Sequence, residues 1–184
     1  MDKTSQQYDQ AVASARDIFL KKTIDYGTSW RVLRNISIID QIYIKAKRIR
    51  NIQETKSQKI SDDIRSEFMG ILNYGVIGLI QLEIGNEDVE DLPLEKVAEL
   101  YDARIFEAKT LMLAKNHDYG EAWRDMSQES FTDLILTKLL RIKQILLNKG
   151  ITLASEGIPA NYFDIVNYAV FALVMEKQQQ QKNQ

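Results

Sequence analysis

A polar phrase, K-x-x-D-Y-G-x-x-W-R, occurs twice in this sequence, at residues 22–31 and again at residues 115–124. Charged residues follow both copies at the same spacing of 93 residues. The matched pairs are Asp40 and Asp133, Lys45 and Lys138, and Arg48 and Arg141. Apolar matches need only packing as an explanation, whereas charged side chains are rarely fully buried unless they are paired. The repeated polar residues are therefore the candidates for chemistry.

The second copy has the residue types of a nucleotide-phosphate site between helices. Lys138 and Arg141 fall on one broad face of a predicted helix, where they would hold phosphate oxygens. Tyr119 or Trp123 would stack on a base or a sugar. The expected substrate-binding residues are Lys115, Tyr119, Trp123, Lys138, Arg141, Asn167 and Tyr168, together with Lys45 and Arg48 from the first copy.

Carboxylates near these cations suggest a magnesium site. Asp133 and Asp164 would hold Mg²⁺, with Asp118 or Glu156 as a further ligand, because oxygen ligands suit this ion. In an enzymatic version the metal would polarise the phosphates. Asp118 or Asp164 would then be the catalytic acid that orients water.

A structural explanation of the same residues stays open beside the functional one. Asp133, Lys138 and Arg141 would form a buried ion-pair network that ties two halves of the protein together. Gly120 would end a helix, and Trp123 would fill the core. Spacing alone does not separate this explanation from a ligand site.

Composition narrows the chemistry further. The 184 residues contain no cysteine and one histidine, His117, which excludes disulfides, thiol catalysis and histidine-rich metal sites. With a net charge of −2, the chain lacks the overall positive charge that is typical of nucleic-acid-binding proteins. The basic stretch 42–51 is therefore interpreted as a solvated helix face, and no direct nucleic-acid contact is expected. With no apolar leader and no apolar stretch of about 20 residues, we expect a cytoplasmic protein without membrane contact.

Few prolines and glycines interrupt the chain, which favours long helices. The apolar spacing predicts helices over residues 5–24, 37–55, 62–83, 94–117, 129–147 and 160–177. Gly27 would end the first helix. Ser37 and Ser61 would cap the second and third. The glutamine-rich tail, residues 178–184, is expected to be disordered.

The match extends over three elements and indicates an internal duplication. In the third element the spacing becomes 94, so that Ile71, Asn73 and Tyr74 match Ile165, Asn167 and Tyr168. The first repeat covers residues 1–83, an acidic linker covers 84–93, and the second repeat covers 94–177. Three helices alone bury a marginal core. We therefore predict one joint all-α domain, a six-helix bundle of two tandem three-helix repeats related by a pseudo-twofold axis. A further homodimer is compatible with this pattern.

The motifs K-x-x-D-Y-G, D-x-x-x-x-K-x-x-R-I and D-I-V-N-Y-A-V resemble the nucleotide modification associated domain 1 family. That family is linked by genomic context to nucleotide or DNA-base modification. The resemblance covers most of residues 16–177, as a tandem form, and the first copy departs from it at Gly70. More distantly, the arrangement is similar to the all-α MazG-like nucleoside triphosphate pyrophosphohydrolases, which hold magnesium on E-x-x-E and E-x-x-D motifs. Neither motif is intact here.

These observations support two functions of different kinds. The first is a nucleotide-binding protein linked to nucleotide or DNA-base modification, with magnesium-dependent nucleotide hydrolysis as its enzymatic version. The second is a non-enzymatic helical adaptor that acts with nucleotide-modifying proteins. The resemblance implies a nucleotide or nucleoside phosphate as the ligand in the first case.

Overall fold

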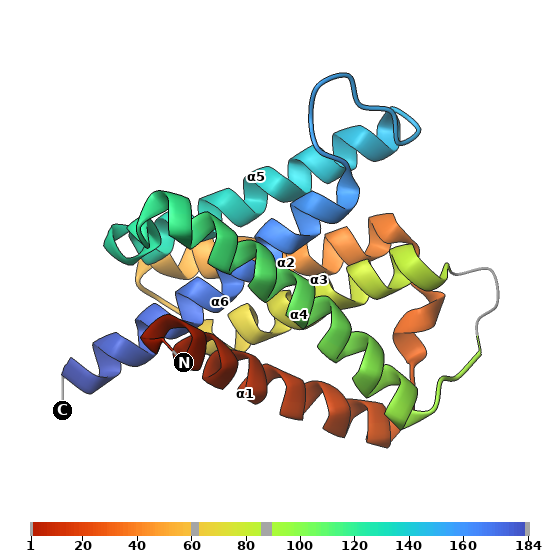
Figure 1. Ribbon diagram of the computed structural model, residues 1–184, viewed down its shortest axis with the longest axis horizontal. Coiled ribbons are helices and arrows are strands. Elements are labelled where there is room, and N and C mark those ends of the chain that lie inside the picture. The colour runs from red at the N-terminus through yellow and green to blue at the C-terminus, as the bar shows by residue number, and fades with distance from the viewer. Residues whose placement is uncertain (1, 60–62, 86–89, 183–184) are drawn as a thin grey trace.

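The computed structural model describes residues 2–59, 63–85 and 90–182. In these residues the chain forms six α-helices and two short 3-10 turns, and no strand (Figure 1). The first half contains α1 (Lys3–Tyr26), η1 (Ser29–Val32), α2 (Asn35–Thr55) and α3 (Ile64–Ile84). The second half repeats this order with α4 (Leu94–Tyr119), η2 (Ala122–Asp125), α5 (Gln128–Leu147) and α6 (Ile158–Lys182).

The two halves pack around a pseudo-twofold axis, as the sequence predicted. Helices α2, α3, α6 and α5 form a closed ring in which each contacts the next, and α1 and α4 lie against α3, α6 and each other. The contacts between α-helices in one half have their counterparts in the other, so that α2 packs on α3 as α5 packs on α6. The prediction of an all-α bundle of two three-helix repeats is confirmed.

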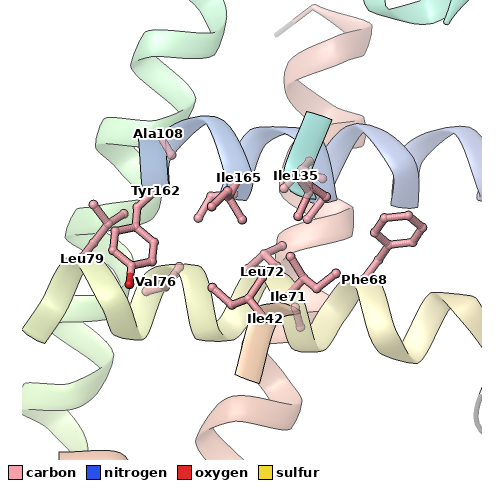
Figure 2. Packing of buried hydrophobic residues seen from close by; sticks show 14 of the residues in the cluster. Ile42, Phe68, Ile71, Leu72, Val76, Leu79, Ala108, Ile135, Tyr162 and Ile165 are labelled. Carbon is pink, nitrogen blue, oxygen red and sulfur yellow. The ribbon is translucent and has the colours of Figure 1, made fainter. Parts of the chain in front are cut away.

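The centre of the core lies between α3 and α6, which run in opposite directions side by side (Figure 2). Ile71 and Leu72 of α3 face Ile165 of α6, and the side chains of Ile42 from α2 and Ile135 from α5 point into the same layer. All five of these side chains are fully buried. The shared apolar layer comes from both halves, which explains why one repeat alone would leave it exposed to water.

Two glycines allow α3 and α6 to approach closely. A Cβ atom at Gly75 would lie 2.8 Å from a methyl group of Val166, and one at Gly78 would overlap the ring of Tyr162. Neither position has room for a larger side chain unless the neighbour shifts. The contact between the repeats therefore depends on these two residues having no side chain.

A symmetric pair of buried amides also joins the halves. Asn73 donates to the backbone oxygen of Ala15 at 3.0 Å and accepts from the hydroxyl group of Tyr101 at 2.8 Å. The equivalent residue, Asn167, donates to the backbone oxygen of Ala108 at 3.0 Å and accepts from the hydroxyl group of Tyr8 at 2.9 Å. Each amide thus binds one helix of its own repeat and one of the other.

The helix ends differ from the sequence prediction in three places. Helix α1 ends at Gly27, and its φ of 65° confirms the prediction that this glycine terminates the helix. Helix α2 begins at Asn35 with Arg34 before it, so Ser37 is not its cap. Ser61 lies outside the described residues, and the Asp63 side chain caps α3 by accepting from the Ser66 N–H group at 2.7 Å. Helix α6 continues to Lys182, so residues 178–182 are helical where disorder was expected, and the last two residues of that predicted tail lie outside the described residues.

Helix α3 and residues 158–178 of α6 are long and apolar enough to cross a membrane, judged by length and composition. Buried residues make up 61% and 67% of the two apolar segments. Both helices are also the central elements of the bundle. Packing in the core accounts for their apolar character.

Candidate functional site

The repeated phrase divides into structural and chemical residues. Gly27 and Gly120 end α1 and α4 with φ values of 65° and 61°, a backbone conformation that favours glycine. Trp30 and Trp123 are both buried. Trp123 stacks on Phe171 with ring centroids 4.3 Å apart. The tryptophan proposed to stack on a base is therefore a core residue whose ring face is already occupied.

The repeated arginines hold the short turns in place. The guanidinium group of Arg31 donates to the side chain of Gln81, whose amide donates back to the Arg31 carbonyl at 3.0 Å. Arg124 donates to Glu121 at 2.6 Å and to Gln7 of the other half at 3.0 Å. In both repeats the arginine at the end of the phrase has a structural role, because its side chain holds the short turn against neighbouring residues.

The lysine that opens the phrase belongs to a different group of residues. In the second repeat, Lys115 of α4 and Lys138 of α5 both bind Asp164 of α6. Lys115 Nζ lies 2.7 Å from one carboxylate oxygen, and Lys138 Nζ lies 2.6 Å from the other. The Asp164 side chain is only 9% exposed. One buried carboxylate thus joins all three helices of the repeat.

Lys115 and Tyr168, which both lie near Asp164, have raised pKa values and keep their protons at neutral pH. Burial acts to lower the pKa of Lys115, but the hydrogen bond and the negative charge of Asp164 outweigh it, so the pKa lies above the ordinary lysine value. Burial raises the pKa of Tyr168, and the charge of Asp164 raises it further. Lys115 is therefore an ammonium group and Tyr168 a neutral phenol at neutral pH.

The first repeat places its carboxylate one turn earlier. Glu67 of α3 is buried, binds Arg48 of α2, and lies 3.3 Å from Lys45 Nζ. The position equivalent to Asp164 is Gly70, so Lys22 has no carboxylate opposite it. Within the residues that the structure describes, no ion pair of Lys22 is formed.

A cavity lies between α1, α2 and α3, and Gly70 is part of its wall. Its volume is about 380 Å³, and it is open to solvent on one side. Its wall combines two lysines, two tyrosines and several apolar side chains. The lining residues include Lys22, Lys45, Tyr26, Tyr74, Glu67 and Gly70, with Ile18, Phe19, Met69 and Ile77 as the main apolar part.

Four other predicted site residues are exposed or already bound by groups of the protein. Asp118 and Tyr119 are exposed at the end of α4, where Asp118 lies 3.1 Å from the ring of His117. Asp133 is exposed near the beginning of α5 and pairs with Arg50 of the other half at 3.5 Å. Asn167 uses both ends of its amide within the protein. These four residues are not gathered around one ligand position.

Arg141 lies beside the loop that follows α5. With Lys138 and Asn161 it lines a broad, open groove of about 770 Å³, which the loop residues 151–156 complete. Tyr168 is close enough for the charge of Arg141 to act on its hydroxyl group. The second repeat therefore has a broad open groove, whereas the cavity of the first repeat is smaller and less open to solvent.

The carboxylates do not fit the expected magnesium site. Asp164 is neutralised by two lysines, and Asp133 pairs with an arginine. Among the residues described, no group of three or more histidine, cysteine, aspartate or glutamate side chains could hold a metal ion. A magnesium ion needs several oxygen ligands that are not already held by cations. The described carboxylates therefore do not support a catalytic step that uses a bound magnesium ion.

Comparison with protein families matches the chain twice to nucleotide modification associated domain 1, over residues 22–82 and 115–175. The chain belongs to this family. Both matches begin at the lysine that opens the repeated phrase and end within the third helix of the repeat. The tandem form inferred from the sequence is thereby confirmed, and the name links the domain to nucleotide modification.

No curated protein and no solved structure matches the chain. The distant similarity to MazG-like pyrophosphohydrolases therefore stays a prediction. In this member of the nucleotide modification associated domain 1 family, the two copies conserve the lysine pair of each repeat but differ in the carboxylate that faces it.

Sequence reasoning missed the cavity itself. The exchange of Gly70 for Asp164, and of Glu67 for Asn161, is visible in the sequence. From the sequence, the departure at Gly70 left open whether the first repeat has a site of its own. The missed signal is the glycine at position 70, over which the Lys45 side chain crosses where the other repeat has a carboxylate.

Proposed function

We propose that this protein binds a nucleotide or another nucleoside phosphate in the cavity of the first repeat. The observation that carries the proposal is the combination of a partly open cavity with two lysines on its wall. A volume of about 380 Å³ lies in the range of small-molecule sites. The family name, which refers to nucleotide modification, points to the same class of ligand.

The wall of the cavity matches the parts of such a ligand. Lys22 and Lys45 supply ammonium groups for phosphate oxygens, a common use of lysine. Tyr26 and Tyr74 offer aromatic rings beside the cations, and Phe19 adds an apolar surface. Base stacking on aromatic side chains contributes about 1–3 kcal/mol per base. Phosphate recognition at one end and ring contacts at the other would together favour a nucleotide over free phosphate.

The proposal concerns binding and includes no hydrolytic step, since the carboxylates do not form a metal site. A thermal-shift panel of deoxynucleoside mono- and triphosphates, with and without Mg²⁺, tests it. A ligand that binds only the folded state raises the melting temperature. The corresponding nucleosides, which lack phosphate, should raise it far less.

A double variant identifies the cavity. Lys22→Ala with Lys45→Ala should abolish the nucleotide-dependent shift and leave the helical fold intact, because Glu67 keeps its contact with Arg48. Lys21→Ala is the matched control, since Lys21 neighbours Lys22 but pairs with Asp17 on the surface of α1. A panel that stays flat for the unmodified protein would refute nucleotide binding and favour the helical adaptor.

A further inference from the structure

Pseudo-symmetry identifies where the anionic end of the ligand lies. This inference rests on the proposed nucleotide site. We infer that one phosphate group binds between Lys22 and Lys45 in the cavity beside Gly70, where it would pair with the two lysines as the Asp164 carboxylate does in the second repeat. The second repeat is closed by its own carboxylate, so the chain binds one ligand rather than two.

The second repeat shows what the lysine pair does with an anion. Lys115 and Lys138 come from the first and second helices of their repeat and converge on one carboxylate from the third. Each oxygen of Asp164 accepts from a different lysine, at 2.7 and 2.6 Å. Asp164 is therefore an internal anion held in a two-lysine site, and it occupies the position that a bound oxyanion would take.

The first repeat has the same lysines without that anion. Lys22 and Lys45 occupy the equivalent positions of α1 and α2, and both line the cavity. A Cβ atom at Gly70 would lie 2.9 Å from Lys45 Cε and 3.2 Å from its Nζ, so the lysine side chain crosses directly over the glycine. The Lys45 side chain therefore fills the space directly above Gly70, and its ammonium group lies at the wall of the cavity.

The carboxylate of the first repeat does not replace the missing one. Glu67 binds Arg48 and lies 3.3 Å from Lys45 Nζ, which is longer than either lysine contact of Asp164. Among the residues that the structure covers, Lys22 makes no ion pair. Two lysines and one carboxylate thus line this cavity. A phosphate group with several oxygens would accept from both lysines at once.

The remaining wall limits the rest of the ligand. Ile18, Phe19, Met69 and Ile77 form the apolar part of the lining. Of the two lysines on the wall, Lys45 crosses over Gly70. A ligand with one terminal phosphate and a ring-containing body fits this division. The inferred class is a nucleoside monophosphate, or a nucleotide whose terminal phosphate enters first.

Gly70→Asp tests the position directly. The new carboxylate should bind Lys22 and Lys45 as Asp164 binds its lysines, and so exclude the ligand phosphate. We expect the affinity for deoxynucleoside monophosphates, measured by isothermal titration calorimetry, to fall about 100-fold or more, as the loss of two charge-assisted hydrogen bonds requires. Because the carboxylate gains two lysine partners, the variant should melt at or above the temperature of the unmodified protein.

Gly70→Asn is the matched control for charge. It fills nearly the same space with a neutral side chain, so it should also block the ligand but melt at a lower temperature than Gly70→Asp. A third variant combines Gly70→Asp with Asp164→Gly. It should move the site to the second repeat, where nucleotide binding returns and then depends on Lys115.

The outcomes separate this inference from the proposed function. Unmodified protein that binds one nucleotide per chain, and loses it in Gly70→Asp, supports both. Nucleotide binding that survives Gly70→Asp, or that has a stoichiometry of two, overturns the inference and leaves the proposed function standing. No nucleotide binding by the unmodified protein overturns both. If the combined variant does not fold, the two single variants still decide the matter.

Discussion

Removing the charge of Asp164 should destabilise the protein strongly. The Asp164 side chain is 9% exposed and that of Lys138 is 13% exposed, with 2.6 Å between Oδ2 and Nζ. Asp164→Asn keeps the shape but leaves the Lys138 ammonium group buried without its counterion. Breaking a buried ion pair by removing one partner costs about 3–5 kcal/mol. We expect about 3 kcal/mol here, because Lys138 keeps some contact with water.

The second lysine contributes much less to this number. The Lys115 side chain is 55% exposed. An exposed ion pair stabilises a protein by about 0–1 kcal/mol. Lys115→Ala should therefore lower the free energy of unfolding by no more than that, and it serves as the matched control for the loss of one contact to the same carboxylate.

Equilibrium unfolding in urea, followed by helical circular dichroism, measures both changes. The comparison assumes one cooperative transition, which coincident fluorescence and circular-dichroism curves would establish. A loss below about 1 kcal/mol for Asp164→Asn would refute the reasoning, because it would show that Lys138 reaches water without its partner. Adding Lys138→Met to the variant should recover most of the lost stability, since no buried charge then remains.

Three further results are expected. Gly78→Ala should lower the free energy of unfolding by about 1–3 kcal/mol, because the new methyl group would overlap Tyr162 where α3 and α6 meet; urea unfolding checks this. Asp63→Ala should cost about 1 kcal/mol at neutral pH through loss of the α3 cap. The backbone N–H group of Ser66 holds the pKa of Asp63 below its usual range, so this stabilisation is complete above the ordinary aspartate pKa and is lost as pH falls through the folded-state pKa. Thermal melts of both proteins across acidic pH should converge. Residues 1–90 alone should show no cooperative melt by circular dichroism, since their core face would be exposed to water.

The fold could be predicted from the sequence because duplication and helical periodicity point to the same arrangement. The spacing of 93 residues relates Lys22 to Lys115, and the same spacing relates the two regions of the family match. Long helices without internal proline leave few alternatives. The least accurate part was the helix ends, where Arg34 precedes α2 without a side-chain cap and α6 continues beyond the expected limit.

The candidate site could be predicted only in part, for a physical reason. Sequence spacing brought Lys138 and Asp164 to neighbouring helices, but it does not show whether a carboxylate is open to a ligand or already bound by a lysine. Trp123 and Asn167 illustrate the same limit, since each has a side chain suited to ligand binding and each is occupied by protein groups. The wall of the cavity includes Gly70, a residue without a side chain, and a search for reactive residue types does not detect such a position.

Joining the repeats in one chain has a consequence for how the protein can change. In a homodimer of such repeats, one sequence would specify both subunits, and any substitution would appear on each side of the axis. In the tandem chain, positions 70 and 164 are encoded separately, and they hold glycine and aspartate. One copy can therefore carry a carboxylate that binds its own lysine pair, while the other copy keeps an open cavity. Identical subunits cannot differ in this way.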